Sequence, residues 1–510
     1  DYNIAYIQFA NVVLNWLWKR LFQGIDVKLD ELAKVRECSR KGPVVYVPSH
    51  KSHIDYLVLN HILYQHHMHI PRIAAGKNLD FWPVGPFFRK SGAFFIRRTF
   101  KGATLYAAVF IRYMKALLEE RHPLEFYIEG GRSRSGKLVL PKIGFLSILV
   151  QAFSEGYCDD LVFVPASITY DRILEGQAYL KELGGGEKER ENIRQVVSTR
   201  RFFKKKYGKI YIRFGEPLLL KEYLTEKEES SGGTQKRLAF DLIRSINRVS
   251  LVTPMALLST VILTKHRRGF NLSELTDTAG TLLAFLEEHR FPTATSLKQP
   301  GMAIEKSLDV LIKSNVVKSL EDAEGTEPFY YVDEEKKREL EYYKNNIIHC
   351  FLPHAFVALS LLTGKEEIKT GGDILKDYDF LKKLFRYEFI YDAGTTSQEE
   401  VDHVAAYFTD VLFITGADAE GGYRLTKLGF DKLPIWAALI KTFLESYWIA
   451  TRSIISKEKG GRKRADLLKN MNYLGQRYHK LGVIEHLEAV SKLSFKNAIR
   501  VVNEDVLTGE

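Results

Sequence analysis

Apolar and polar positions follow two different patterns along the chain. Between residue 41 and about residue 220, short apolar runs typical of β-strands alternate with longer segments of helical periodicity. The pattern predicts strands at 43–47, 93–97, 124–128, 161–165 and 209–214, and helices at 54–65, 103–120 and 144–155. Strands that alternate with helices indicate an α/β fold with a mixed, partly parallel sheet flanked by helices.

Helical periodicity dominates the two ends of the chain. Residues 1–24 are predicted to form an amphipathic, aromatic-rich helix in which Trp16 and Trp18 lie close to Lys19 and Arg20. Such a helix is typical of a membrane interface, and a helix packed on the protein's own core accounts for the same pattern. After about residue 235 the chain is mainly helical. We therefore predict a membrane-associating segment at 1–40, an α/β domain at 41–235 and a helical domain at 236–510.

The chain is basic and long. Its 510 residues exceed one ordinary core, and Lys and Arg outnumber Asp and Glu by 74 to 63, which gives a net charge of +11. This excess favours an anionic partner such as a phosphorylated substrate, an anionic membrane surface or an acidic carrier protein. The basic residues are dispersed and no nucleic-acid-binding module is recognisable, so nucleic acid is not an expected partner.

Cysteine usage and hydropathy narrow the class of protein further. Cys38, Cys158 and Cys350 lie far apart, so they indicate neither a disulfide framework nor a metal site, as in a protein that faces a reducing compartment. No run reaches the ~18–20 apolar residues of a membrane-spanning helix. We therefore expect a protein that does not span a bilayer. The sequence begins with Asp1 rather than Met, which is compatible with a piece of a longer protein.

A histidine and an aspartate follow the first long apolar strand. His50 lies at the end of the strand, and Asp55 lies where the next helix begins. Residues five apart lie roughly 140° apart around a helix. The two side chains can therefore meet only if His50 lies in the turn and Asp55 near the helix start. A histidine oriented by a carboxylate can remove a proton from an alcohol, although short His…Asp spacings also arise by chance.

Two further strands end in cations. The strand at 93–97 ends in Arg97 and Arg98, whose planar guanidinium groups suit a phosphate, although an ordinary surface pair is an alternative. The strand at 124–128 leads into a glycine turn with Arg132 and Arg134. This turn nearly matches a nucleotide-binding P-loop, but Leu138 replaces the required Ser or Thr. A phosphate held by arginines without metal is more consistent with these residues.

A fourth motif, at 162–170, overlaps the predicted strand at 161–165; it contains Pro165 and small residues and carries no acid, base or nucleophile. In this order and spacing the four motifs resemble the glycerolipid acyltransferase superfamily. The similarity is greatest to the bacterial membrane-bound glycerol-3-phosphate 1-O-acyltransferases. It covers residues 40–350 and includes segments 74–83, 94–102, 214–217 and 342–346.

The resemblance implies roles for individual residues. His50 corresponds to the general base and Asp55 to its orienting partner, within a catalytic domain at 41–235. The implied substrate-binding residues are Arg97, Arg98, Glu129, Gly130, Arg132, Ser133, Arg134 and Pro165. Lys51 departs from the pattern, because many relatives have Arg there, and the bidentate geometry of Arg is lost.

The implied reaction transfers a fatty acyl group from acyl-CoA or acyl carrier protein to the sn-1 hydroxyl of glycerol 3-phosphate. The product is lysophosphatidic acid, in the first step of phospholipid synthesis. Such a transfer needs a base and stabilisation of an oxyanion, but no metal or redox cofactor. The implied location is the cytoplasmic face of a bacterial inner membrane, with peripheral or monotopic attachment. The alternatives are an acyltransferase for dihydroxyacetone phosphate or lysophosphatidate, and a non-catalytic lipid-binding membrane protein.

Overall fold

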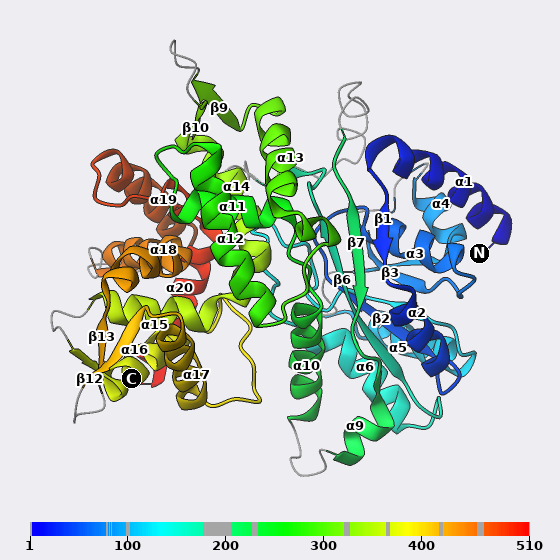
Figure 1. The fold of residues 1–510 in the computed structure, drawn as a ribbon. Coiled ribbons are helices and arrows are strands. Elements are labelled where there is room, and N and C mark those ends of the chain that lie inside the picture. The colour runs from blue at the N-terminus through cyan, green and yellow to red at the C-terminus, as the bar shows by residue number, and fades with distance from the viewer. Residues whose placement is uncertain are drawn as a thin grey trace. The chain divides into compact units, whose positions relative to one another are not determined.

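The computed structural model describes residues 3–77, 80, 82, 84–97, 102–176, 179, 206–226, 233–320, 327–363, 368–417, 422–455 and 464–508. The chain divides into two compact units, and Figure 1 labels the helices and strands of each. The first unit comprises Asp1–Ser133, Leu138–Leu174 and Asn192–Leu251, and the second comprises Arg134–Lys137, Glu175–Glu191 and Val252–Glu510. The short segment Arg134–Lys137 therefore belongs to the second unit, although its neighbours in sequence on both sides belong to the first.

The first unit is built on one mixed sheet. Its strands are β1 (Ile25–Val27), β2 (Val44–Pro48), β3 (Arg72–Gly76), β4 (Ala93–Ile96), β5 (Leu124–Glu125), β6 (Val162–Tyr170), β7 (Ile210–Phe214) and β8 (Leu218–Leu219). Its helices are α1 (Ile4–Leu21), α2 (Leu29–Cys38), α3 (Asp55–Gln65), α4 (Val84–Lys90), α5 (Thr104–Glu119), α6 (Ile143–Ser154), α9 (Leu220–Glu226) and α10 (Thr234–Arg248). The strand order is β1-β7-β6-β2-β5-β3-β4, and β8 pairs with β6.

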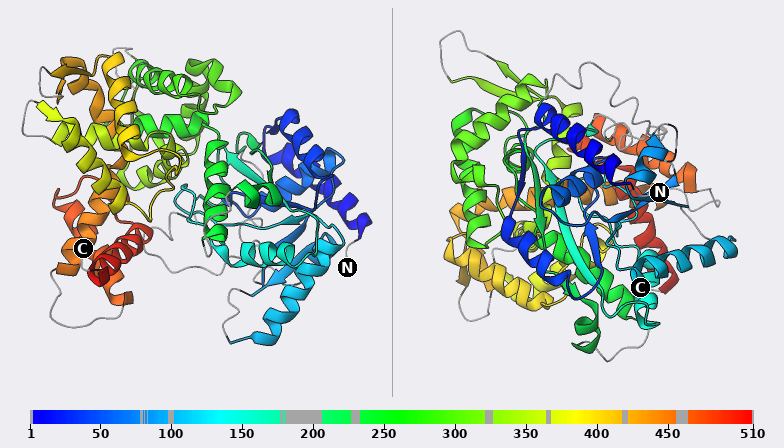
Figure 2. Two further views of the ribbon diagram at one scale, coloured as in Figure 1. Left: turned by 90° about the horizontal axis from the view of Figure 1, so that it is seen from below. Right: turned by 90° about the vertical axis from the view of Figure 1, so that its right-hand side faces the viewer.

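Strand direction explains where side chains gather. Strands β2 to β6 run parallel to one another, whereas β7 and β8 pair antiparallel with β6. The predicted mixed, partly parallel sheet is therefore confirmed. Right-handed crossovers place α3 and α4 on one face of the sheet and α5 and α6 on the other (Figures 1 and 2). The packing agrees, because α1 contacts α3 and α4, while α6 contacts α5 and α10.

The neighbouring strands β2 and β5 form a switch point in this sheet. The connection after β2 runs over one face toward β3, and the connection after β5 runs over the other face toward β6. Connections that leave adjacent parallel strands in opposite directions open a crevice at their carboxyl ends, where α/β proteins bind ligands. The chain segments that begin with His50 and Phe126 follow these two strands.

Helix α1 has one buried and one exposed apolar face. Phe9, Val12 and Trp16 are at least 60% exposed and recur at spacings of three and four residues. Trp18 is only 3% exposed, and its ring centroid lies 6.0 Å from that of Phe22. The expectation that both tryptophans serve a membrane interface is therefore wrong for Trp18, because two residues separate side chains by roughly 200° around a helix.

The second unit is mainly helical, as predicted. Its helices are α11 (Pro254–Thr264), α12 (Leu272–Glu288), α13 (Pro300–Lys313), α14 (Glu334–Ile347), α15 (Leu352–Thr363), α16 (Gly371–Leu384), α17 (Ser397–Asp410), α18 (Lys427–Ile455), α19 (Arg464–Lys480) and α20 (Lys492–Thr508), with short 3₁₀ turns at Thr295–Lys298, Ile348–Cys350 and Leu487–Ala489. Its strands are β9 (Val317–Leu320), β10 (Phe329–Val332), β11 (Ile368–Thr370), β12 (Ile414–Ala417) and β13 (Gly422–Leu425). They pair as β9 with β10 and in the order β11-β13-β12. The core of the unit surrounds α11, whose residues 254–263 are all buried against α12, α13, α14 and α18.

Helix length and composition bear on membrane crossing. Among the described residues, no single helix is both long and apolar enough to cross a bilayer. One pair, Glu334–Cys350 with Leu352–Thr363, meets the length and composition criteria together, but its two members are bent by 94°.

Candidate active site

The His50 side chain meets Asp55 directly. Strand β2 is buried along its whole length and ends at Pro48, so the rigid centre of the sheet carries His50 two residues later. Asp55 is the first residue of α3. The distance between His50 Nδ1 and Asp55 Oδ2 is 2.9 Å. The imidazole thus lies in the turn and the carboxylate at the helix start, as their spacing requires.

The Asp55 carboxylate accepts hydrogen bonds from four donors. Its Oδ2 atom accepts from His50 Nδ1 and from the backbone N–H groups of Lys51 (2.7 Å) and Ser52 (2.8 Å). Its Oδ1 atom accepts from the hydroxyl of Tyr170 at 2.5 Å. A carboxylate has no proton to give, so Nδ1 of His50 carries the hydrogen and Nε2 carries the lone pair. This tautomer is the one that a general base at Nε2 requires.

The third motif holds the backbone of His50. The N–H group of His50 donates to Glu129 Oε1 at 2.7 Å, and Glu129 Oε2 accepts from the N–H group of Val139 at 2.9 Å. The carbonyl of His50 accepts from the N–H group of Ser133 at 2.7 Å. Glu129 is only 1% exposed. Its carboxyl group therefore positions the residue that carries the imidazole, and the role in substrate binding that the resemblance implies stays a prediction.

Three side chains, those of Tyr127, Glu125 and Asn60, are linked to the imidazole by stacking and hydrogen bonds. The ring of Tyr127 stacks on that of His50, with centroids 3.9 Å apart and an interplanar angle of 26°. The Tyr127 hydroxyl donates to Glu125 Oε1 at 2.8 Å, and the Asn60 amide donates to Glu125 Oε2 at 2.9 Å. Sequence reasoning missed these three residues and Tyr170. The available signal was Glu125, an acidic residue inside an apolar strand.

Burial sets the protonation of these groups. Burial lowers the pKa of His50 below its usual 6.5, the hydrogen bond and charge of Asp55 oppose that shift, and the charge of Arg132 adds to it. Burial lowers the pKa of Lys51 to about 8. Burial also raises the pKa of Glu125 and of Glu129 to about 8, against the hydrogen bonds that each carboxyl group accepts. His50 is therefore neutral, and able to accept a proton, at neutral pH.

The predicted arginines have different surroundings. Arg132 is 8% exposed, and its charge acts on His50. Arg97 follows β4 at the same edge of the sheet and is exposed, with its guanidinium 4.7 Å from the centroid of the Tyr106 ring. Because β4 is three strands from β2, the two strands are roughly 14 Å apart. Arg98 lies outside the described residues. Arg134 belongs to the segment that is part of the second unit.

Gly130 and Pro165 shape the backbone around the site. Gly130 has a φ of +64°, and a Cβ atom there would lie 2.6 Å from the side chain of Lys142. Pro165 is buried in β6, in register with Val47 of β2. Its carbonyl accepts from the N–H group of Gly215 at 2.8 Å. Both residues therefore serve the local fold, and a substrate contact by either stays a prediction.

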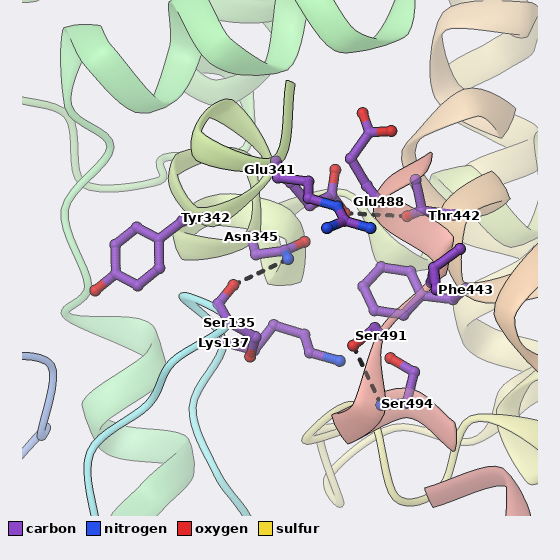
Figure 3. A pocket seen from close by; sticks show the side chains of 12 residues that line it. Ser135, Lys137, Glu341, Tyr342, Asn345, Thr442, Phe443, Glu488, Ser491 and Ser494 are labelled. Carbon is purple, nitrogen blue, oxygen red and sulfur yellow. Dashed lines mark hydrogen bonds between the residues drawn. The ribbon is translucent and has the colours of Figure 1, made fainter. Parts of the chain in front are cut away.

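The last part of the glycine turn is built into the second unit. Gly136 has a φ of +89°, and a Cβ atom there would lie 2.0 Å from the carbonyl oxygen of Tyr342 in α14. The amide of Asn345 donates to the carbonyl of Ser135 at 3.0 Å (Figure 3). Lys137 pairs with Glu388. Lys137, the lysine of the near-match to a P-loop, is thus an internal ion-pair partner and not a phosphate ligand.

A small cavity of about 40 Å³ adjoins this segment within the second unit (Figure 3). Its wall combines the glycine turn with side chains from α14, α18 and the start of α20. The lining residues are Ser135, Lys137, Arg338, Glu341, Tyr342, Asn345, Thr442, Phe443, Glu488, Val490, Ser491 and Ser494. The Nζ atom of Lys137 lies 4.2 Å from the centroid of the Phe443 ring. The cavity is therefore bordered by the contacts that anchor the turn.

Comparisons with known proteins show the family to which the chain is similar. Residues 179–509 match the family described as "Glycerol-3-phosphate acyltransferase C-terminal region", and residues 26–169 match the family "Acyltransferase". The chain is 33% identical over 524 residues to a glycerol-3-phosphate acyltransferase of Pasteurella multocida (strain Pm70), with 99% of this chain and 63% of that protein covered. It is 35% identical over 524 residues to one of Pseudomonas putida (strain W619), with 99% and 62% covered.

Among solved structures, the crystal structure of the 1-acyl-sn-glycerophosphate (LPA) acyltransferase PlsC from Thermotoga maritima aligns with a TM-score of 0.28 and 17% identity. That alignment covers 48% of this chain and 77% of the other. The chain spans slightly less than two thirds of the length of the two curated relatives. The match to the glycerol-3-phosphate acyltransferase region extends over more than half of the chain. The chain therefore belongs to the glycerol-3-phosphate acyltransferase family.

Proposed function

We propose that this chain transfers a fatty acyl group from acyl-CoA or acyl carrier protein to the sn-1 hydroxyl of glycerol 3-phosphate. The observation that carries the proposal is the 2.9 Å contact between His50 Nδ1 and Asp55 Oδ2, which leaves Nε2 as the basic nitrogen. This base lies at the switch point of the sheet, where α/β proteins bind ligands. The names of the relatives support glycerol 3-phosphate as the acceptor.

The reaction needs only proton transfer and charge stabilisation. Nε2 of His50 removes the proton from the sn-1 hydroxyl as its oxygen attacks the thioester carbonyl. The resulting imidazolium is stabilised by Asp55. Collapse of the tetrahedral oxyanion breaks the carbon–sulfur bond, and the departing thiolate takes the proton from the imidazolium. The products are lysophosphatidic acid and the free thiol, and His50 returns to its neutral form.

The phosphate of the acceptor is assigned to the arginines. Arg132 is the described arginine whose charge acts on His50. Its planar fork can bind two phosphate oxygens. Arg97 and Arg98, with the hydroxyl of Ser133, are assigned to the same acceptor on the motif pattern, and the role of Arg134 stays what the resemblance implies. Glycerol 3-phosphate is only several ångströms long, so a phosphate held near Arg132 leaves its sn-1 hydroxyl within reach of the imidazole.

Purified protein in mixed micelles tests the assignment. The variant His50→Ala is expected to lose acyl transfer by roughly a thousandfold, since general base catalysis contributes ~10²–10⁴-fold. The exposed His69 offers a matched control, and His69→Ala should keep full activity. Retained activity in His50→Ala, with an unchanged melting temperature, would remove His50 from the mechanism. Faster turnover of dihydroxyacetone phosphate or lysophosphatidate than of glycerol 3-phosphate would overturn the acceptor assignment.

We also propose that the exposed face of α1 attaches the protein peripherally to an anionic membrane surface, at the cytoplasmic face of a bacterial inner membrane. Phe9, Val12 and Trp16 present apolar side chains, and Lys19 and Arg20 lie in the last turn of the helix. Aromatic and aliphatic side chains that enter the headgroup region, together with cations, give such a helix its affinity for anionic lipid.

Point variants test this attachment better than truncation, because truncation would also remove the buried Trp18 and Leu21. Burial of one Val side chain contributes about 1.5 kcal/mol or more. The variant Val12→Glu should therefore weaken cosedimentation with anionic phospholipid vesicles by at least about tenfold. The exposed Gln8 provides a control for the added charge. Equal binding by Val12→Glu and Gln8→Glu would place the attachment elsewhere.

A further inference from the structure

Tyr170 lies outside the motif residues that the resemblance assigns to catalysis or binding, yet it contacts the proposed catalytic pair. It is the last residue of β6, pairs in register with Ile210 of β7, and is 3% exposed. Its ring centroid lies 6.3 Å from that of Phe22. Its hydroxyl donates to Asp55 Oδ1 at 2.5 Å. A residue mounted in the sheet thus contacts the carboxylate that orients His50.

The two oxygens of the Asp55 carboxylate accept hydrogen bonds from different parts of the chain. Oδ2 accepts from His50 Nδ1 and from the N–H groups of Lys51 and Ser52, all of which lie on one loop. Oδ1 accepts from Tyr170, which lies 115 residues away in the sequence. A carboxylate can rotate about its Cβ–Cγ bond, because that torsion is broad. A donor on each oxygen fixes this rotation, and with it the direction in which Oδ2 faces the imidazole.

We propose that Tyr170 is a positioning residue for acyl transfer, which fixes the plane and the charge of Asp55 and thereby the orientation and basicity of His50. This proposal rests on the proposed function, because it assigns a task within the same site. Tyr170 contacts the proposed catalytic pair through the hydrogen bond from its hydroxyl to Asp55 Oδ1. Its effect passes through Asp55.

The hydroxyl also affects the charge that His50 meets. A hydrogen bond donated to a carboxylate draws negative charge toward the donor, so Asp55 attracts the imidazolium less strongly than it would without Tyr170. Removal of the hydroxyl should therefore make His50 more basic. Three other charged or titratable groups act on the imidazole electrostatically: Asp55 from α3, His53 from the turn before α3, and Arg132. In addition, the ring of Tyr127 stacks on the imidazole, and Glu129 accepts from the backbone N–H group of His50.

The variant Tyr170→Phe keeps the ring and removes only the hydroxyl. We expect kcat to fall by about tenfold, because Asp55 can then rotate and the imidazole loses its fixed orientation, a loss that outweighs its higher basicity. The KM for glycerol 3-phosphate should stay within about twofold, because the phosphate contacts are untouched. The kcat/KM profile has an acid limb, where activity falls because His50 becomes protonated. In the variant this limb should move to higher pH by about half a unit, because His50 is more basic.

Tyr223 provides a matched control within the first unit. It is 6% exposed, and its hydroxyl donates to Asp241 Oδ2 at 2.7 Å, so Tyr223→Phe removes the same kind of hydrogen bond away from the site. This variant should leave kcat and the acid limb unchanged. Melting temperatures of both variants report whether each has folded.

A second measurement does not depend on acyl transfer. Diethyl pyrocarbonate modifies the neutral form of imidazole, so the rate of His50 modification against pH, followed by peptide mass spectrometry, gives the midpoint of its titration. In Tyr170→Phe this midpoint should rise in step with the acid limb. An unchanged midpoint and an unchanged limb would overturn the proposal, even if kcat falls. A wild-type protein that does not acylate glycerol 3-phosphate would refute the proposed function, while the modification assay would still decide the role of Tyr170.

Discussion

Replacing Asp55 with asparagine removes the negative charge beside His50 and keeps the shape of the side chain. The backbone N–H groups of Lys51 and Ser52 point at Oδ2 from 2.7 and 2.8 Å, so the amide oxygen of the asparagine must take that position. Its NH₂ group then replaces Oδ1 and faces the hydroxyl of Tyr170, which can turn to accept. His50 Nδ1 still finds an acceptor, and the tautomer with the lone pair on Nε2 survives.

The magnitude follows from the charge alone. A hydrogen bond to a charged group contributes about 1.5–3 kcal/mol and a neutral one about 0.5–1.5 kcal/mol. The imidazolium that forms in the transition state therefore loses about 1–2 kcal/mol of stabilisation, which corresponds to about a 5- to 30-fold lower kcat. Asp55 raises the pKa of His50 against the effect of burial. Its replacement should therefore lower that pKa further and move the acid limb to lower pH.

The assay is kcat/KM for acyl transfer across a pH range that spans the limb, with Asp241→Asn as a control. Asp241 accepts from Tyr223 at 2.7 Å and from Arg244 at 2.9 Å, so its replacement makes the same chemical change away from His50. A plateau rate equal to that of the wild type, or an acid limb moved to higher pH, would refute the reasoning. Inactivation as complete as in His50→Ala would mean that the amide is reversed and the tautomer lost.

Two further predictions concern stability. The Gly136→Ala variant should lower the free energy of urea unfolding of the second unit by about 2 kcal/mol or more. The added Cβ atom strains the left-handed backbone and lies 2.0 Å from the Tyr342 carbonyl oxygen. In the control variant Gly131→Ala the added Cβ atom has nothing within 4 Å, so the free energy of unfolding should change by less than about 0.5 kcal/mol. An equal effect of the two variants would contradict the anchoring contact. Burial raises the pKa of Glu125 to about 8 from an ordinary 4.5, so the folded form binds more protons than the unfolded form between these pH values. The ionisation of Glu125 therefore lowers the free energy of unfolding as pH rises, by about 1.4 kcal/mol per pH unit. Melting temperatures of Glu125→Gln should therefore fall less between about pH 5 and about pH 7.5 than those of the wild type, and an equal slope would contradict this account.

The strong strands could be predicted because most of their residues are apolar and many are β-branched or aromatic. The predicted strand at 43–47 corresponds to β2, and that at 209–214 to β7. Strand β3 was missed, because Arg72–Gly76 contains two alanines and a glycine and has little of the β-branched character that marks a strand. The predicted strand at 161–165 ends five residues too early. Pro165 suggests an end, yet its carbonyl accepts from Gly215 and β6 continues to Tyr170.

The local part of the site could also be predicted, but its long-range part could not. The five-residue spacing of His50 and Asp55 restricts them to a turn and a helix start, and the structure has that placement. The contacts of Tyr170 with Asp55 and of Glu129 with His50 join residues 115 and 79 positions apart. Such contacts depend on strand order, which apolar periodicity does not encode. The roles of the arginines and of Glu129 in binding therefore remain predictions from motif similarity.

The contacts of His50 set opposing demands on its basicity. Burial favours the neutral imidazole, which is the form that can accept a proton. Burial acting alone would also make the imidazolium less stable, and in the proposed transfer His50 would then be a weaker base. The negative charge of Asp55 stabilises the imidazolium and so opposes the effect of burial. The N–H groups of Lys51 and Ser52 and the hydroxyl of Tyr170 also donate to Asp55, and these hydrogen bonds reduce that stabilisation. A backbone carbonyl could orient the ring equally well but could not supply charge, so in the proposed mechanism the carboxylate serves the transition state rather than the resting tautomer.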